Sequence, residues 1–365
     1  MSGPKPLDGI TVADFSELLP GPFMTGALAE MGARIIKIER PGGDGLRQSQ
    51  PGTFGIVNRG KESVTLDLKS GADRKRAEEI VRAADVMVEG FRPGVMARLG
   101  LGYEAMAEVN RGLIYISLSG YGQTGPMVSA PGHDLNYLAL AGVTALCGTP
   151  DGPPDHTFGL PVADLGGGLY GLASVLAALF QRERTGQGQY IDLSITDCMA
   201  HWLNPRRGVY NHRGIDDPAG QREVALVRPA YGVFACTDGA VSVAALEDHF
   251  WKNLCRALDL GRFAGAEWDR LAARRTAMRD INAAIAKALS PMTRDAAMAV
   301  LGSHDVPASP VLTVNEATGS DHFAARGLIT ETSGGGPAVP FPVRLRGMTA
   351  SMPPAPALGS PAPES

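Results

Sequence analysis

Residues 10–15 read Ile-Thr-Val-Ala-Asp-Phe, an apolar run with the length of a buried strand. The turn Leu-Pro-Gly-Pro at 19–22 follows, then a helical pattern at 23–31 that Gly32 closes. A second apolar strand is predicted at 33–38. Strand, turn, helix and strand in this order form a βαβ unit, which implies parallel strands and a right-handed crossover.

The same pattern continues along the first half of the chain. Further strands are predicted at 63–68, 86–89, 113–119 and 190–195, and helices at 71–84, 96–99, 103–109 and 166–184. Strands that alternate with helices are typical of an α/β fold with a parallel sheet. We therefore predict a Rossmann-like large domain over residues 1–205.

The second half has a different composition. Residues 206–228 are rich in arginine and aspartate with little apolar periodicity, and we predict a linker there. Asp238-Gly239 between two apolar runs predicts a hairpin at 231–236 and 240–245. Helices are predicted at about 247–259, 277–289 and 293–302. These elements indicate a small α+β domain at 229–330, followed by a glycine- and proline-rich tail at 331–365.

The bulk composition excludes several classes of protein. The chain has 365 residues, 44% hydrophobic and 20% charged, with a net charge of -4. This balance argues against a nucleic-acid binder or a membrane-surface protein, which are usually basic. Four scattered cysteines without a CxxC pair suggest neither a zinc site nor disulfides. With no signal-like N-terminus and no uncharged run of the ~20 residues a span needs, we predict a cytoplasmic protein without a membrane partner.

Two loop-to-helix junctions hold the candidate catalytic groups. His133 follows a glycine at the first junction, and Asp164 lies at the second, before the glycines at 166–168. A histidine here can act as a general base, although a surface histidine and a helix-capping aspartate are the simpler alternatives. Three glycines cost roughly 1 kcal/mol each in a helix. We therefore expect a close backbone approach at Gly166 and Gly167, such as a bulky ligand requires.

Positive charges gather near predicted strand ends in the first hundred residues. They are Arg40, Arg47, Lys61, Arg92 and Arg98. As a set at one sheet edge they could bind a phosphate-bearing ligand, although each alone is typical of a solvated surface. The glycines at 42–45 do not form a GxGxxG motif and no P-loop occurs, so neither NAD nor ATP is indicated.

Glu247 opens a predicted helix of the small domain. Its simplest role is a helix N-terminal acid, stabilised by the helix dipole. The functional alternative is that it orients His133 across a domain or subunit boundary.

The ordered motifs resemble the family III CoA-transferase superfamily of the CaiB/BaiF type. This group includes α-methylacyl-CoA racemases and formyl-CoA and carnitine CoA-transferases. The resemblance covers nearly the whole chain. Its motifs are Leu-Asp-Gly-Ile at 7–10, Gly-Ala-Arg-Ile-Ile-Lys-Ile-Glu-Arg-Pro at 32–41, Asn-Arg-Gly-Lys-Glu-Ser at 58–63, Arg-Pro-Gly-Val-Met-Ala-Arg-Leu-Gly at 92–100, Ser-Gly-Tyr-Gly-Gln-Thr-Gly-Pro at 119–126 and Arg-Thr-Gly-Gln-Gly-Gln at 184–189.

The resemblance implies an interlocked homodimer of two ring-like chains, in which the C-terminal tail returns to the large domain. It implies an acyl-CoA substrate, with CoA carried as part of that substrate and no other cofactor or metal. Arg40 and Arg98 match family positions that contact the adenosine phosphates, and Lys61 lies near them. We also expect Tyr137, Gly166 and Gly167 to contribute to CoA binding.

The resemblance leaves two reactions open. In the transferases the residue that matches Asp164 is a nucleophile, which forms mixed-anhydride and thioester intermediates. In the racemases it is one of two bases, and the other is the histidine of Gly-His-Asp-x-Asn-Tyr, present here at 132–137. Glu247 matches the supporting glutamate of racemases, and the chain lacks the glycine-rich loop of formyl-CoA transferases. The segment 228–234, by contrast, is more similar to transferases.

We predict a 2-methylacyl-CoA racemase that acts by 1,1-proton transfer between His133 and Asp164. The alternative is a CoA-transferase with Asp164 as nucleophile. A non-catalytic acyl-CoA-binding protein is a third possibility, against which the intact His133, Asp164 and Glu247 argue.

Overall fold

The computed structural model describes residues 5–156, 158–332, 336–346 and 353–360, which divide into two compact units. The large unit contains the chain up to Thr144, His156–Asn204 and the part from His322 onward. The small unit contains Ala145–Asp155 and Pro205–Asp321. The short segment 145–155 thus leaves the predicted large domain and belongs to the small unit.

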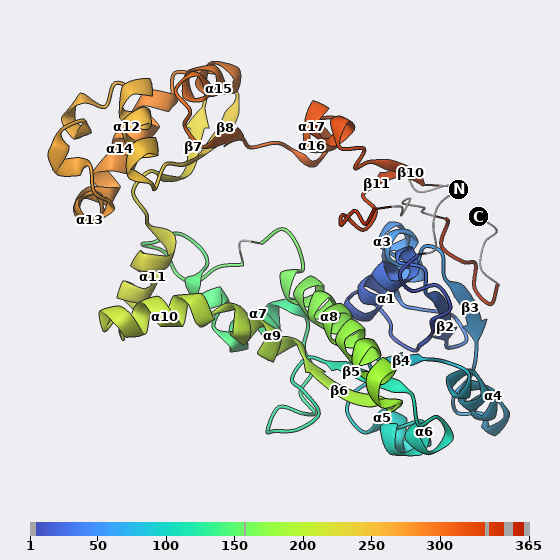
Figure 1. The fold of residues 1–365 in the computed structure, drawn as a ribbon. Coiled ribbons are helices and arrows are strands. Elements are labelled where there is room, and N and C mark those ends of the chain that lie inside the picture. The colour runs from blue at the N-terminus through green and yellow to red at the C-terminus, as the bar shows by residue number, and fades with distance from the viewer. Residues whose placement is uncertain (1–4, 157, 333–335, 347–352, 361–365) are drawn as a thin grey trace. The chain divides into compact units, whose positions relative to one another are not determined.

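The large unit is built on six parallel strands, as the βαβ pattern predicts (Figure 1). The strands follow the order β3-β2-β1-β4-β5-β6, which is that of a doubly wound Rossmann sheet. Their bounds are β1 (Thr11–Asp14), β2 (Arg34–Glu39), β3 (Glu62–Thr65), β4 (Val86–Glu89), β5 (Ile114–Ser119) and β6 (Gln189–Ser194). The chain winds outward from β1 in one direction and from β4 in the other, so these two strands form the topological switch point.

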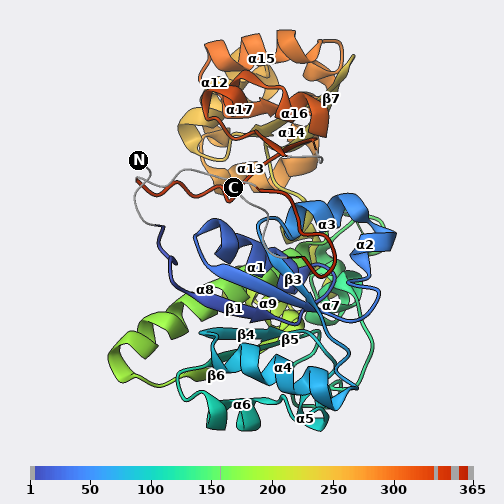
Figure 2. The same cartoon turned by 90° about the vertical axis from the view of Figure 1, so that its right-hand side faces the viewer.

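Helices cover both faces of this sheet (Figure 2). On one face lie α1 (Pro20–Glu30) and α8 (Val162–Thr185), and on the other α4 (Gly71–Arg82), α5 (Val95–Arg98) and α6 (Tyr103–Val109). The side chains of successive strand residues point to opposite faces of the sheet. Val12 packs with α1 and α8, and Ala13 packs with α4. Because both faces are covered, most strand residues are buried on either side of the sheet, including the charged Lys37 and Glu39 of β2.

Helix packing explains the glycines of α8. A Cβ atom on Gly166 would lie 2.6 Å from Met199 Cε in α9 (Ile195–Trp202), and one on Gly168 would lie 2.9 Å from the carbonyl oxygen of Pro20. A Cβ on Gly167 would meet Ile195 at 3.0 Å. The close approach inferred from the sequence is therefore between helices. Packing on α9 accounts for Gly166 and Gly167 without a ligand, and their contribution to CoA binding stays a prediction.

α8 is also long and apolar enough to resemble a membrane span by composition. Half of its most apolar window is buried inside the protein, where it packs on α1 and the sheet. It is the core helix of the large unit.

The small unit has an antiparallel sheet in the order β7-β8-β9, of β7 (Tyr231–Cys236), β8 (Gly239–Ala244) and β9 (Ala308–Pro310). The hairpin predicted at Asp238-Gly239 is formed by β7 and β8. Trp251 of α12 (Asp248–Ala257) is buried against α14 (Met278–Leu289) and α15 (Arg294–Ser303).

The predicted linker at 206–228 is mostly helical, which corrects that prediction. It contains α10 (Asn204–Arg213) and α11 (Pro218–Leu226), and the side chain of Asp217 caps α11 by accepting from the amide of Gly220 at 2.7 Å. Arg222 of α11 donates to the carbonyl oxygens of Ala145 at 2.6 Å and Thr149 at 2.7 Å. These bonds attach the segment 145–155 to the small unit.

The described part of the tail lies along the large unit. The amide of Ser63 in β3 donates to the carbonyl oxygen of Ser360 at 2.8 Å, and the amide of Gly60 donates to that of Pro354 at 3.2 Å. The remaining elements are α2 (Leu46–Ser49), α3 (Pro51–Val57), α7 (Asp134–Ala141), α13 (Leu271–Arg274), α16 (Val314–Thr318), α17 (Asp321–Ala325), β10 (Thr330–Thr332), β11 (Gly336–Ala338) and the 3-10 turns Thr144–Leu146, Gly261–Phe263, Ala266–Trp268 and Arg275–Ala277.

Candidate active site

A cavity of about 300 Å³ opens at the carboxyl ends of β1, β4 and β5. This is where doubly wound sheets bind their ligands, because the loops at the switch point separate and leave a crevice. The segments that follow the three strands line it, together with residues of α7 and α8: Ser16–Leu18, Gly90–Pro93, Leu118–Tyr121, Pro131–His133, Tyr137 and Asp164. The two junctions singled out in the sequence therefore meet in one cavity.

His133 is the residue immediately before α7 and is exposed at the cavity. Its backbone is extended, and its amide donates to Asn136 Oδ1 at 3.0 Å. This bond fixes the start of the helix. The amide of Asn136 donates to the carbonyl oxygen of His133 at 2.8 Å. Among the described residues this leaves the amides of Asp134 and Leu135, at the start of the helix, as donors to a developing negative charge.

Asp164 is the third residue of α8 and does not cap it. The cap is supplied by Asp134, whose Oδ1 accepts from the amides of Ala163 at 2.7 Å and Asp164 at 3.0 Å. Within the part of the chain that the structure describes, the Asp164 carboxylate accepts no hydrogen bond. The capping alternative for Asp164 is thus corrected, and its carboxylate is free for chemistry.

The surroundings of Asp164 favour its neutral form. Burial raises the pKa of Asp164 to about 7, and the nearby carboxylate of Asp134 acts in the same direction. Burial and then Asp164 raise the pKa of Tyr137 to about 12. Tyr137 is therefore neutral, and its hydroxyl donates to the carbonyl oxygen of Gly132 at 2.6 Å. Asp164 has the titration range of a group that exchanges charge during a reaction at neutral pH.

The role of Asp134 leads to a pH prediction. Asn at 134 keeps an oxygen that can cap α8 but removes the charge, so the pKa of Asp164 should fall. In Asp134→Asn the acidic limb of the kcat/KM profile should move to lower pH by roughly one unit or less. The profile of Glu104→Gln, which removes an exposed charge from α6 on the opposite face of the sheet, should be unchanged. If the acidic limb of Asp134→Asn did not move, the charge of Asp134 would not be a cause of the raised pKa of Asp164.

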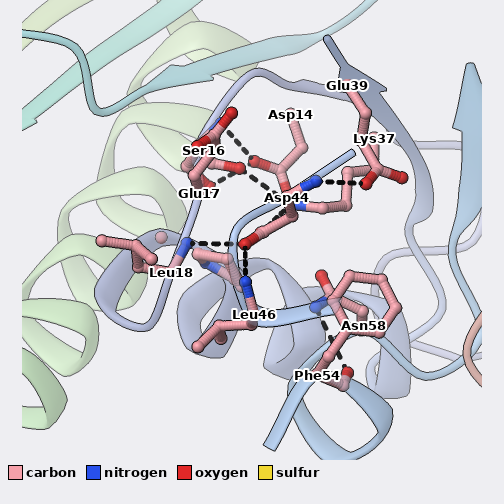
Figure 3. Close-up of polar contacts among 12 residues, drawn as sticks. Asp14, Ser16, Glu17, Leu18, Lys37, Glu39, Asp44, Leu46, Phe54 and Asn58 are labelled. Atoms are coloured by element: carbon pink, nitrogen blue, oxygen red, sulfur yellow. Dashed lines mark hydrogen bonds and ion pairs between the residues drawn. The ribbon is translucent and has the colours of Figure 1, made fainter. Parts of the chain in front are cut away.

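A buried charge network supports the cavity wall formed by residues 16–18 (Figure 3). Lys37 Nζ lies 2.9 Å from Asp44 Oδ2 and donates to the carbonyl oxygen of Ser16 at 2.8 Å. Asp44 Oδ1 accepts from the amides of Leu18 at 3.3 Å and Leu46 at 2.9 Å. Leu18 has a positive φ of 65°, which is costly for a leucine. The network holds this strained residue at the cavity.

Lys61 belongs to the same buried region, which corrects its predicted role. Its side chain is fully buried, with Nζ 2.7 Å from Thr25 Oγ1, 2.9 Å from Asn58 Oδ1 and 3.3 Å from Asp14 Oδ2. Burial lowers the pKa of Lys61 to about 8, against the attraction of Asp14. The Lys61 ammonium group is therefore enclosed by protein atoms and is not presented at the surface to a CoA phosphate.

Arg40, Arg92 and Arg98 are exposed, and their role in binding phosphate groups stays a prediction. Arg40 follows β2 and lies 3.3 Å from Glu17, a residue of the cavity. Arg98 is exposed at the end of α5, and Arg92 lines the cavity. Arg47, in contrast, is bound to Glu39 at 2.7 Å. The sequence alone did not separate these arginines, because their distances from the cavity depend on the fold.

Glu247 lies in the small unit, directly before α12. Its side chain is exposed and makes no capping bond to the helix. Its action on His133 therefore stays a prediction. No cluster of metal ligands occurs in the described ranges of the chain.

Comparison with known proteins identifies the family. The model of CoA-transferase family III matches residues 7–361, and the chain belongs to this family. The acetyl-CoA:oxalate CoA-transferase of Acetobacter aceti is 38% identical over 343 residues, which are 90% of this chain and 86% of that protein. The human alpha-methylacyl-CoA racemase is 33% identical over 335 residues, 88% of this chain and 81% of that protein. The crystal structure of a CaiB/BaiF family protein from Brucella suis aligns with a TM-score of 0.84 at 30% identity, covering 99% of this chain and 97% of that chain.

Proposed function

We propose that this member of CoA-transferase family III moves CoA between carboxylic acids, with Asp164 as the nucleophile. The observation that carries the proposal is the Asp164 carboxylate, which lies in the switch-point cavity without a hydrogen-bond partner among the described residues. Burial raises its pKa to about 7, and a more basic carboxylate is a better nucleophile. This revises the preference for a racemase, since the relatives named above include a transferase of higher identity.

The reaction proceeds through four exchanges at the Asp164 carboxyl group. Its oxygen attacks the thioester carbonyl of the donor acyl-CoA, the C–S bond breaks, and CoA leaves as a thiolate. The thiolate attacks the Asp164 carbonyl of the resulting anhydride and releases the donor acid as a carboxylate. The acceptor carboxylate then attacks the Asp164 thioester and again releases the thiolate. Attack of the thiolate on the acceptor acyl carbonyl gives the new acyl-CoA and regenerates Asp164.

We propose supporting roles in this cycle for further groups. The start of α7 brings the amides of Asp134 and Leu135 and the positive end of the helix dipole close to the cavity, where they can stabilise a developing oxyanion. We propose that Arg40 and Arg98 bind the CoA phosphates and that Tyr137 shapes the acyl end of the site. From the resemblance we further propose a cytoplasmic, interlocked homodimer that needs no metal, in which Glu247 orients His133.

A racemase is the second candidate, because His133 and Asp164 line the same cavity. A histidine and a carboxylate on opposite sides of one carbon could exchange its α-proton.

Solvent exchange separates the two reactions. The enzyme is incubated in D2O with a panel of CoA esters, among them a 2-methylacyl-CoA, with and without added carboxylic acids. A transferase forms the CoA ester of the added acid and incorporates no deuterium. Deuterium at C2 in the absence of any acid would overturn the proposal in favour of racemisation.

His133→Ala gives a second prediction. For a transferase we expect a loss in kcat of roughly tenfold or less, because the histidine is not the nucleophile. A racemase should lose the roughly 10²–10⁴-fold that a general base provides. The measurement is kcat for CoA transfer in the purified variant, with His212→Ala, an exposed histidine of α10, as the control. A loss of 10³-fold or more in transfer would show that His133 acts in the chemical step.

A further inference from the structure

A second cavity, of about 320 Å³, lies entirely within the small unit. Its wall contains seven apolar residues and four arginines. The apolar residues are Val209, Val224, Val227, Pro229, Leu246, Leu271 and Met278, and the arginines are Arg206, Arg213, Arg228 and Arg275. α10 and α11 contribute much of this wall, so the polar segment that looked like a linker shapes a cavity.

The four arginines lack carboxylate partners. Within the described residues none of them forms an ion pair. Arg206 donates to the carbonyl oxygen of Ala225 at 3.3 Å, and the Arg228 guanidinium lies 5.1 Å from the ring centre of Tyr231. Other arginines of the same unit are neutralised: Arg279 binds Asp151 at 2.8 Å and Glu223 at 2.7 Å.

The charges of this group also act on one another. Burial and then Arg228 lower the pKa of Arg206. Burial, Arg213 and Arg228 lower the pKa of Arg275. Like charges around a partly apolar cavity are unfavourable without a counter-charge. A bound anion would remove that cost, since guanidinium groups bind carboxylates and phosphates through paired charge-assisted hydrogen bonds.

We propose that this cavity binds a small organic anion, with a carboxylate or phosphate group on the arginines and a carbon skeleton on the apolar wall. Two sources share this chemistry: a free dicarboxylate, or a phosphate group of CoA. The cavity wall includes Leu246, which directly precedes Glu247 in the chain. The inference does not depend on the reaction that Asp164 performs.

Titration calorimetry on the full-length protein at low ionic strength tests the site, with succinate and CoA as separate probes. We expect Arg213→Gln and Arg275→Gln each to weaken binding of at least one probe tenfold or more. Arg256→Gln, an exposed arginine of α12 outside the cavity, should bind both probes like the wild type. Weakened succinate binding identifies a carboxylate, and weakened CoA binding identifies a phosphate.

Folding is monitored separately by melting temperature, because removal of a like charge should not destabilise the small unit. The proposal is overturned if neither probe binds, or if binding is the same in the wild type, Arg213→Gln and Arg275→Gln. It is equally overturned if Arg256→Gln weakens binding as much as the cavity variants. These outcomes are independent of CoA transfer, which Asp164→Asn tests.

Discussion

Asparagine in place of Asp164 should lower kcat for CoA transfer by about 10⁴-fold or more, because it removes the only atom proposed to form covalent intermediates. Binding should be retained, since the arginines proposed to hold CoA are unchanged. Transfer is measured by the rate of formation of the acceptor CoA ester, and binding by calorimetry with CoA. Transfer within tenfold of the wild type would exclude Asp164 as the nucleophile.

The same substitution should stabilise the protein at alkaline pH. The pKa of Asp164 rises from an ordinary 3.8 to about 7 on folding, so the folded state binds more protons between these values. Its contribution to stability is therefore present below about pH 4 and is lost as the pH rises through 7. At pH 8 the wild type carries a buried charge, which costs about 2 kcal/mol after allowance for partial exposure. Asparagine carries none.

Denaturation at two pH values measures this effect. Asp164→Asn should be more stable than the wild type at pH 8 by about 2 kcal/mol, and the difference should nearly vanish at pH 4. Glu104→Gln, which removes an exposed charge, should show no such dependence on pH. If Asp164→Asn and the wild type were equally stable at pH 8, burial would not disfavour the charged form of Asp164. Active-site residues often lower the stability of the folded protein, because their arrangement serves the reaction rather than the fold.

The parallel sheet could be predicted because short stretches of the sequence specify each of its strands and helices. Each strand is a short apolar run bounded by turns, and the helix between two strands enforces a parallel crossover. The strand ends then locate the cavity, since parallel strands end at one edge. His133 and Asp164 could be found for the same reason: both follow turns that precede apolar helices.

The sequence-based predictions that the structure does not support concern features that depend on residues far apart in the chain. The glycines of α8 suggested a ligand, but the atoms they approach belong to α9 and α1. Asp134 caps a helix that begins 28 residues later, which no local pattern reveals. Lys61 looked like a surface charge because lysine is rarely buried. Its partner Asp14 lies 47 residues earlier, so only the fold shows that the pair is internal.

Substitution of Lys37 by methionine should destabilise the large unit by about 3–5 kcal/mol, since it leaves Asp44 as an unpaired buried charge. Both side chains are fully buried. Arg34→Met in the same strand is the matched control. Arg34 pairs with Glu62 but is 60% exposed, so its loss should cost less than about 1 kcal/mol. Chemical denaturation measures both values, and equal effects would contradict a special role for the buried pair.

The double variant Lys37→Met with Asp44→Leu separates stability from function. Replacing a buried ion pair by apolar side chains is often close to neutral, so much of the lost stability should return. The bonds from Lys37 to the carbonyl of Ser16 and from the amide of Leu18 to Asp44 do not return. Leu18 would then be free to leave its strained conformation at the cavity. We therefore expect the double variant to be stable but at least tenfold slower in CoA transfer, because small displacements of positioning residues are costly. Full recovery of both properties would show that the network stabilises the fold without shaping the site.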